Sequence, residues 1–115
     1  MREIKFRAWD KTKKKMLDAV DLQDKHLYTI WLEENLEWMQ NTGLKDKDGK
    51  PIYEGDIIDL MLHIVGTKKD RCKVYFEDGG FKAKSYENEV SLSNFYTKHG
   101  KKIGNVWENP ELLSF

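Results

Sequence analysis

The 115-residue chain has one cysteine, two prolines and three histidines, and these low counts remove several classes of protein. A lone cysteine, Cys72, cannot build an intramolecular disulfide framework, which favours a reducing compartment. His26, His63 and His99 are far apart in the sequence and lack the closely spaced His or Cys partners of a zinc site. The sequence therefore predicts no disulfide scaffold, no metal site and no cofactor.

A net charge of one sign is also absent, because 20 basic residues balance 20 acidic ones. Such a chain does not present a whole surface built for nucleic acid or anionic membrane, although a local patch is left open. The longest apolar run, around residues 57–65, contains Asp59 and His63 and is too short to span a bilayer. Residues 2–5 (REIK) give no apolar core of a signal peptide. We therefore expect a soluble cytoplasmic protein without a membrane partner.

Catalytic motifs are missing as well. No Gly-x-Ser-x-Gly, P-loop or Gly-x-Gly-x-x-Gly pattern occurs. Cys72 alternates with Val74 and Phe76 toward an apolar face, so we interpret it as an inert core thiol. The odd separation of Asp56 and Asp59 places them on opposite faces of a strand, which excludes a carboxylate pair on one face. The sequence predicts that the protein is not an enzyme.

What the chain does have is a high content of charged residues, 35%, together with 12% aromatic residues. Disordered chains contain few aromatics, so this composition indicates a globular protein with a very polar surface and a core of large side chains. A chain of 115 residues is long enough for one domain with a real core. We therefore expect a single compact unit.

The stretch 41–59 (NTGLKDKDGKPIYEGDIID) has the densest turn chemistry in the chain. Asp48-Gly49 near the end of a polar run predicts a turn, and Pro51 suits the start of a strand because it cannot donate a ladder hydrogen bond. A second reversal at residues 54–56 precedes an apolar segment over 57–62 that predicts a strand.

The aspartates of this stretch raise the question of a calcium site. When Gly49 is set at the glycine position of an EF-hand loop, Asp46 and Asp48 fall on ligand positions. Leu44 and Gly55, however, take the places of the first and the last ligand. The stretch is therefore predicted to be a solvated turn.

Period-two alternation predicts strands along most of the chain. Residues 3–18 are expected to form a hairpin with a polar tip, whose basic run Lys11 to Lys15 either holds phosphates or keeps the strand edge soluble. Asp78-Gly79-Gly80 provides the positive φ that a primed hairpin turn needs. The strands expected around this turn and elsewhere are 71–77, 81–85, 26–32, 36–40 and 101–107.

Three further segments need separate interpretation. Residues 26–32 and 36–40 form paired strands, unless Leu32, Leu36 and Met39 form the apolar side of a helix instead. Residues 86–100 give no clear period and fit either a short helical turn or irregular chain. Near the C-terminus, Asn109-Pro110-Glu111 has the composition of an N-cap and first helical turn, so we expect one turn that docks Leu112 and Leu113.

Three islands of sequence stand out when the chain is read as a whole. They are IKFRAWD at residues 4–10, NTGLKD with IYEGDI at residues 41–46 and 52–57, and IGNVWENPELL at residues 103–113. In order and spacing they resemble the YopX family of small proteins encoded by bacteriophages and prophages. The resemblance covers nearly the whole chain.

The resemblance implies a mainly β protein with minor α content and a short terminal helical turn. Residues 1–50 then form an N-terminal strand-rich part, and residues 51–115 form an SH3-type barrel part of the same compact unit. It implies the cytoplasm of a bacterial host and carries over no established activity. Motif residues such as Gly55, Trp107 and Leu112 are of the kind that turns and cores require.

Two functional hypotheses follow from different observations. Four tryptophans and many strands leave sheet edges and aromatic surface to cover. We therefore expect a non-enzymatic accessory protein that acts through a protein partner or as a homo-oligomer in assembly.

The alternative hypothesis is a weak single-stranded nucleic-acid-binding module. One face of the hairpin over 71–84 would present basic and aromatic side chains to phosphates and bases. The candidate residues are Arg71, Lys73, Tyr75, Lys82 and Lys84. Glu77 and Asp78 nearby favour an ordinary solvated sheet face instead.

Overall fold

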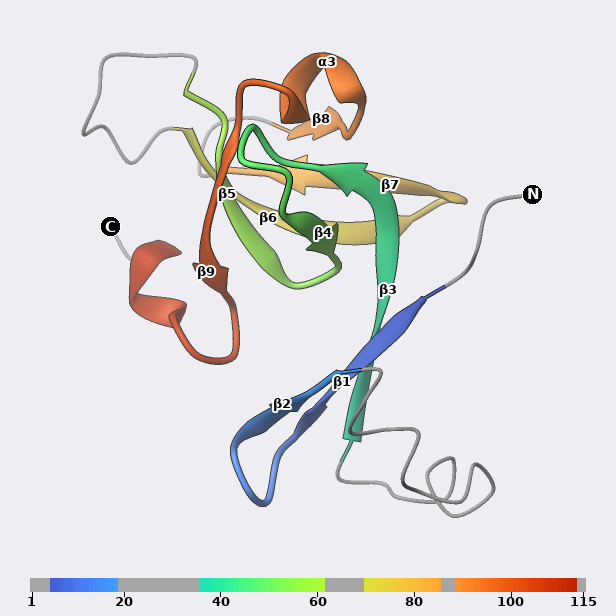
Figure 1. Cartoon of the computed structure of the whole chain (residues 1–115), viewed down its shortest axis with the longest axis vertical. Helices are drawn as coiled ribbons and strands as arrows, with labels where there is room; N and C mark the ends of the chain where they lie inside the picture. The colour runs from blue at the N-terminus through green and yellow to red at the C-terminus, as the bar shows by residue number, and fades with distance from the viewer. Residues whose placement is uncertain (1–4, 19–35, 62–69, 86–88, 114–115) are drawn as a thin grey trace. The chain divides into compact units, whose positions relative to one another are not determined.

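A computed structural model describes residues 5–18, 36–61, 70–85 and 89–113 (Figure 1). The chain forms two compact units, Met1–Asn41 and Thr42–Phe115, which are described separately below. The boundary expected at residue 50 lies in the turn between strands β3 and β4. Among the described residues, no helix has the length and apolar content needed to cross a bilayer.

The first unit is built on an antiparallel hairpin of β1 (Phe6–Asp10) and β2 (Lys15–Leu17), as the sequence predicts. Asp10 closes the turn, because its Oδ1 accepts the backbone N–H groups of Thr12 and Lys13 at 3.0 Å each. At the tip, Lys11 Nζ lies 3.1 Å from Glu37 Oε1. This ion pair favours the soluble-edge interpretation of the basic run over a phosphate site.

Strand β3 (Leu36–Lys45) completes this unit by pairing with β1, with Ala8 opposite Trp38. The strand assignment of residues 36–40 is therefore confirmed, and a helix over Leu36 and Met39 is wrong. Residues 26–32 lie outside the described residues, as does their expected pairing with 36–40. The small core of this sheet consists of Ala8, Leu17 and Leu36.

The sequence wrongly predicts that β3 ends at Asn41-Thr42-Gly43, since the strand continues to Lys45. Gly43 absorbs a φ of +82° without a steric penalty. Thr42 Oγ1 donates to the Ile52 carbonyl at 2.8 Å and accepts the Leu44 N–H at 3.1 Å. This buried side chain ties β3 to the neighbouring β4 (Pro51–Tyr53), so Pro51 begins a strand as predicted.

The second unit contains a five-stranded antiparallel sheet in the order β8-β7-β6-β5-β9. Its strands are β5 (Asp56–Asp59), β6 (Arg71–Glu77), β7 (Gly80–Lys84), β8 (Glu89–Ser91) and β9 (Lys101–Asn105). The core against it consists of Ile52, Ile58, Leu60, Cys72, Val74 and Ala83. Strand β9, the last of these strands in the chain, pairs with β5, the first of them. The SH3-type detail stays a prediction, because no ladder joins edge strands β8 and β9 among the described residues.

The β6–β7 hairpin forms as predicted. Asp78 has a φ of 52° and Gly79 a φ of 80°, which is the pair of positive φ values of a type I′ turn. The turn fixes the register, in which Glu77 pairs with Gly80 and Tyr75 with Lys82. Two other strands are shorter than expected, since β5 ends at Asp59 and β9 ends at Asn105.

The segment without a clear sequence pattern contains β8 and a short helix, α3 (Asn94–Thr97). The expected terminal turn is present as a 3-10 helix, η2 (Pro110–Leu113). Arg71 Nη1 donates to the Leu112 carbonyl at 3.3 Å, which holds η2 beside β6. Asn109 lies just before this turn, where its Oδ1 accepts the Asn105 N–H at 3.2 Å and its carbonyl accepts the Leu112 N–H at 3.1 Å, while its expected capping role stays a prediction.

The contact of Asn109 with Asn105 leads to a first testable prediction at Gly104. A Cβ added at Gly104 would lie 2.5 Å from Asn109 Oδ1 and 2.8 Å from Asn109 Cγ. Gly104→Ala must displace Asn109 from Asn105, so we expect the free energy of unfolding to fall by about 1–3 kcal/mol. Chemical denaturation with urea measures the change.

The matched control is Gly80→Ala. Nothing lies within 4 Å of a Cβ added at Gly80, which also has no positive φ. We expect this variant to change the free energy of unfolding by less than about 1 kcal/mol. Equal losses in both variants would contradict the role given to the Gly104–Asn109 contact.

Candidate functional site

The register of the β6–β7 hairpin brings the five predicted candidates to one face of the sheet. Lys73 pairs with Lys84 and Tyr75 pairs with Lys82, while Arg71 lies two residues before Lys73 on β6. The opposite face of the same strands is buried core. We call these five residues the outer strip: Arg71, Lys73, Tyr75, Lys82 and Lys84.

Acidic residues interrupt the positive charge of the outer strip. Lys82 Nζ lies 3.6 Å from Glu89 Oε1 and 3.8 Å from Asp78 Oδ2. Arg71 is engaged with the Leu112 carbonyl. Within the described parts of the chain, only Lys73 and Lys84 of the strip cations have neither an ion-pair nor a hydrogen-bond partner. The strip is therefore a mixed-charge surface.

Tyr75 is held in the same network. Partial desolvation, the hydrogen bond to Glu89 and the charges of Glu89 and Glu77 together raise the pKa of Tyr75 to about 12. The phenol is therefore neutral at physiological pH and donates to the Glu89 carboxylate. A nucleobase that stacked on this half-buried ring would lie beside the negatively charged Glu89 carboxylate.

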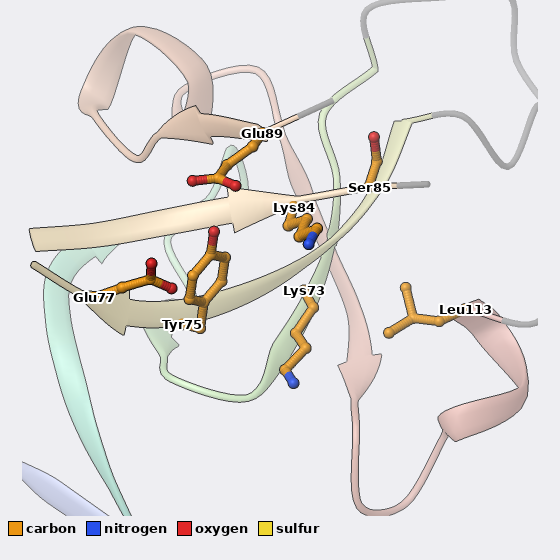
Figure 2. A pocket seen from close by; sticks show the side chains of 7 residues that line it. All are labelled: Lys73, Tyr75, Glu77, Lys84, Ser85, Glu89 and Leu113. Carbon is orange, nitrogen blue, oxygen red and sulfur yellow. The ribbon is translucent and has the colours of Figure 1, made fainter. Parts of the chain in front are cut away.

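An open hollow of about 490 Å³ lies on this face (Figure 2). Figure 2 shows the Tyr75 and Glu89 side chains directed toward one another, with Leu113 approaching from η2. We call this cavity the outer hollow. Its lining residues are Lys73, Tyr75, Glu77, Lys84, Ser85, Glu89 and Leu113. It therefore offers two cations, two carboxylates, a phenol and an apolar wall, a set suited to binding a ligand with both charge signs.

Strand β8 borders this hollow, and among the described residues no strand pairs with it on the side away from β7, so we call that side its open edge. Because the Leu92 N–H donates to the Phe81 carbonyl at 2.9 Å, the hydrogen-bonded pairs of the β7–β8 ladder are Phe81/Leu92 and Ala83/Val90. The main-chain groups of Glu89 and Ser91 therefore point away from β7. The sequence gives no signal for this edge, because residues 86–100 lack a period.

Cys72 and the histidines do not contribute to the hollow. Cys72 is buried on the core face, where desolvation and the charges of Asp70 and Asp59 raise its pKa to about 11. This agrees with an inert core thiol. His99 is exposed, whereas His26 and His63 lie outside the described residues. In the described part of the chain, no three His, Cys, Asp or Glu residues gather as a metal site requires.

Comparison with protein families matches residues 5–114 to the family described as YopX protein. The chain belongs to the YopX family. Among curated proteins, no match is found.

Two solved structures are similar to this YopX-family chain. The first is protein EF1440 from Enterococcus faecalis, with a TM-score of 0.71 and 28% identity, over 99% of this chain and 100% of that one. The second is protein yopX from Bacillus subtilis, with a TM-score of 0.60 and 23% identity, over 100% of this chain and 98% of that one. These likenesses support the fold and give no activity.

The YopX-like motif residues of the middle island serve structure in this chain. Asp46 Oδ1 accepts the N–H groups of Asp48 and Lys50, and Asp46 Oδ2 accepts that of Lys102, at 2.9–3.0 Å. Asp56 Oδ2 accepts the Tyr53 N–H at 2.7 Å and lies 3.2 Å from Lys102 Nζ. Two buried aspartates from different turns thus converge on one residue of β9.

Proposed function

We propose that this YopX-family chain is a non-enzymatic accessory protein of a phage or prophage that binds an extended segment of a protein partner. The observation that carries the proposal is the open edge of β8 beside the outer hollow. An unpaired strand edge binds another strand through main-chain hydrogen bonds, and pockets beside it select side chains.

The chemistry of β8 defines what such a segment would present. Glu89 and Ser91 face the outer strip, while Val90 packs against the core. The Glu89 side chain is 45% exposed and still accessible to a cation. A basic residue beside Glu89 and an apolar residue beside Val90 therefore fit best, with alternation of period two.

Ser91→Pro tests this proposal. The change removes an outward N–H of β8 and leaves the ladder to β7 intact, because Ser91 and Lys82 are a non-hydrogen-bonded pair of this ladder. Peptides of a displayed random library, selected on the immobilised full chain, should be extended and alternate apolar with basic residues. We expect Ser91→Pro to bind them about tenfold more weakly.

Ser91→Ala is the matched control, because it keeps the N–H and should keep the affinity. Selected peptides that bind Ser91→Pro as tightly as the parent would contradict the proposal, as would a library that yields no binder. Light scattering of the free chain over a range of concentrations distinguishes a second copy from a different protein as the partner.

The alternative function, weak binding of single-stranded nucleic acid at the outer strip, is favoured by one observation. Lys73 and Lys84 lie directly opposite one another and have no ion-pair partner in the described residues. The interleaved carboxylates of Glu77 and Glu89 oppose it. Binding of an oligonucleotide that weakens steeply with salt and is lost in Lys73→Glu/Lys82→Glu/Lys84→Glu would establish this alternative.

A further inference from the structure

A second hollow of about 490 Å³ lies elsewhere on the Thr42–Phe115 unit and shares no lining residue with the outer hollow. One wall is the end of β3 with the residues that follow it, 43–47, and the other comprises Asn94 of α3 and Lys98 just after this helix. The Lys47 N–H donates to the Gly100 carbonyl at 2.9 Å, which fastens the two walls together.

The positive charge of this hollow is not neutralised as that of the outer strip is. Lys45, Lys47 and Lys98 are all exposed, and none has an ion-pair partner among the described residues. Among the described lining residues, the one acidic residue is Asp46, which is buried. Both of its carboxylate oxygens accept main-chain N–H groups, and its one negative charge is outnumbered by the three lysines. We call this site the lysine hollow.

An exposed aromatic ring lies beside the lysine hollow. Phe95 of α3 is 68% exposed, which is the largest exposed fraction of any large hydrophobic residue among the described residues. The Lys98 Nζ lies 5.7 Å from the centroid of its ring, and the Tyr96 ring meets it edge-on at 5.1 Å. Lys98 lies over this ring and Phe95 is still 68% exposed, so a nucleobase can stack on the part of the ring that Lys98 does not cover.

We propose that the lysine hollow binds single-stranded nucleic acid, with phosphates at Lys45, Lys47 and Lys98 and one base on Phe95. An acidic peptide would satisfy the lysines but has no use for an exposed apolar ring. A duplex keeps its bases stacked inside and could not use the ring either. The site does not depend on the β8 edge, so it can exist whether or not a protein partner binds there.

Fluorescence anisotropy of the full chain with a labelled 12-nucleotide oligothymidylate tests the proposal. We expect at least about tenfold weaker binding by the triple variant Lys45→Glu/Lys47→Glu/Lys98→Glu. For the parent, the logarithm of the binding constant should fall with the logarithm of the salt concentration with a slope of about −2, as three phosphate contacts to a single strand predict. Phe95→Ala should bind about tenfold more weakly with an unchanged salt slope, because it removes stacking and no charge.

The matched control is Lys73→Glu/Lys84→Glu, which makes the same kind of charge change on the outer strip and should leave the affinity within about twofold. Ser91→Pro should also leave it unchanged, which separates this site from the proposed protein-binding edge. Thermal unfolding of each variant verifies that these exposed substitutions leave the fold intact.

Three results would overturn the proposal: no binding by the parent at low salt, full affinity in Phe95→Ala, or loss of affinity only in the outer-strip variant. Oligoglutamate that displaces the oligonucleotide from the parent and binds Phe95→Ala equally well would identify an acidic peptide as the ligand instead.

Discussion

Asp56→Ala is expected to lower the free energy of unfolding by about 3 kcal/mol. The Asp56 side chain is fully buried, and its Oδ2 is 2.7 Å from the Tyr53 nitrogen and 3.2 Å from Lys102 Nζ. Removing the carboxylate breaks the hydrogen bond from the Tyr53 N–H and the ion pair of the partly buried Lys102 ammonium. Among the described residues, Lys102 Nζ then keeps the Pro51 carbonyl at 3.3 Å. Urea denaturation at neutral pH measures the loss.

Asp56→Asn separates the two contributions, because the amide oxygen still accepts the Tyr53 N–H while the charge is lost. We expect it to destabilise the protein by about half as much as alanine does. A change below about 0.5 kcal/mol in Asp56→Ala, the size of an ordinary surface substitution, would show that this aspartate does not tie β9 to the turn before β5.

Asp46→Ala is expected to cost about 2–3 kcal/mol and to do so only while the carboxylate is ionised. Burial on its own would raise the pKa of Asp46, but the backbone N–H groups of Lys102, Lys50 and Asp48 outweigh it and hold the pKa below its usual value. A carboxyl group with a lowered pKa in the folded state stabilises the fold above its unfolded pKa. This stabilisation is lost as the pH falls through the folded pKa.

Unfolding measured at neutral pH and again below about pH 4 should therefore show the parent and Asp46→Ala converging in acid. Asp48→Ala is the matched control, because Asp48 is exposed and should change the free energy of unfolding by less than about 0.5 kcal/mol at either pH. A constant difference between the parent and Asp46→Ala at both pH values would contradict a role for the ionised carboxylate.

The β6–β7 hairpin could be predicted from sequence because its determinants are local. Strict alternation on both sides of Asp78-Gly79 sets the faces, and the positive φ values of the turn set the register. The outer strip follows from these two facts. The position of Glu89, which neutralises part of the strip, could not be predicted, because β8 lies in a segment whose alternating pattern is too short to indicate a strand.

The course of β3 and the lysine hollow could not be predicted for a different reason. Asn41-Thr42-Gly43 has the local composition of a turn, and the bonds of Thr42 to Ile52 and Leu44 and of the Asn41 N–H to the Lys5 carbonyl help to keep it in a strand. The lysine hollow joins the end of β3 to α3, and no local pattern brings Lys45 and Lys98 together. Contacts between distant segments decide both features.

The position of β9 at the end of the sheet order has a consequence for synthesis. Strand β5 pairs on one side with β6 and on the other side with β9. During translation β9 is synthesised after all the other described strands. Until Lys102 emerges, Asp46 and Asp56 lack their shared partner and β5 exposes a free edge that contains Ile57 and Ile58. The nascent chain thus passes through a stage with an apolar, unpaired strand, and in that interval it is most open to aggregation and to chaperones.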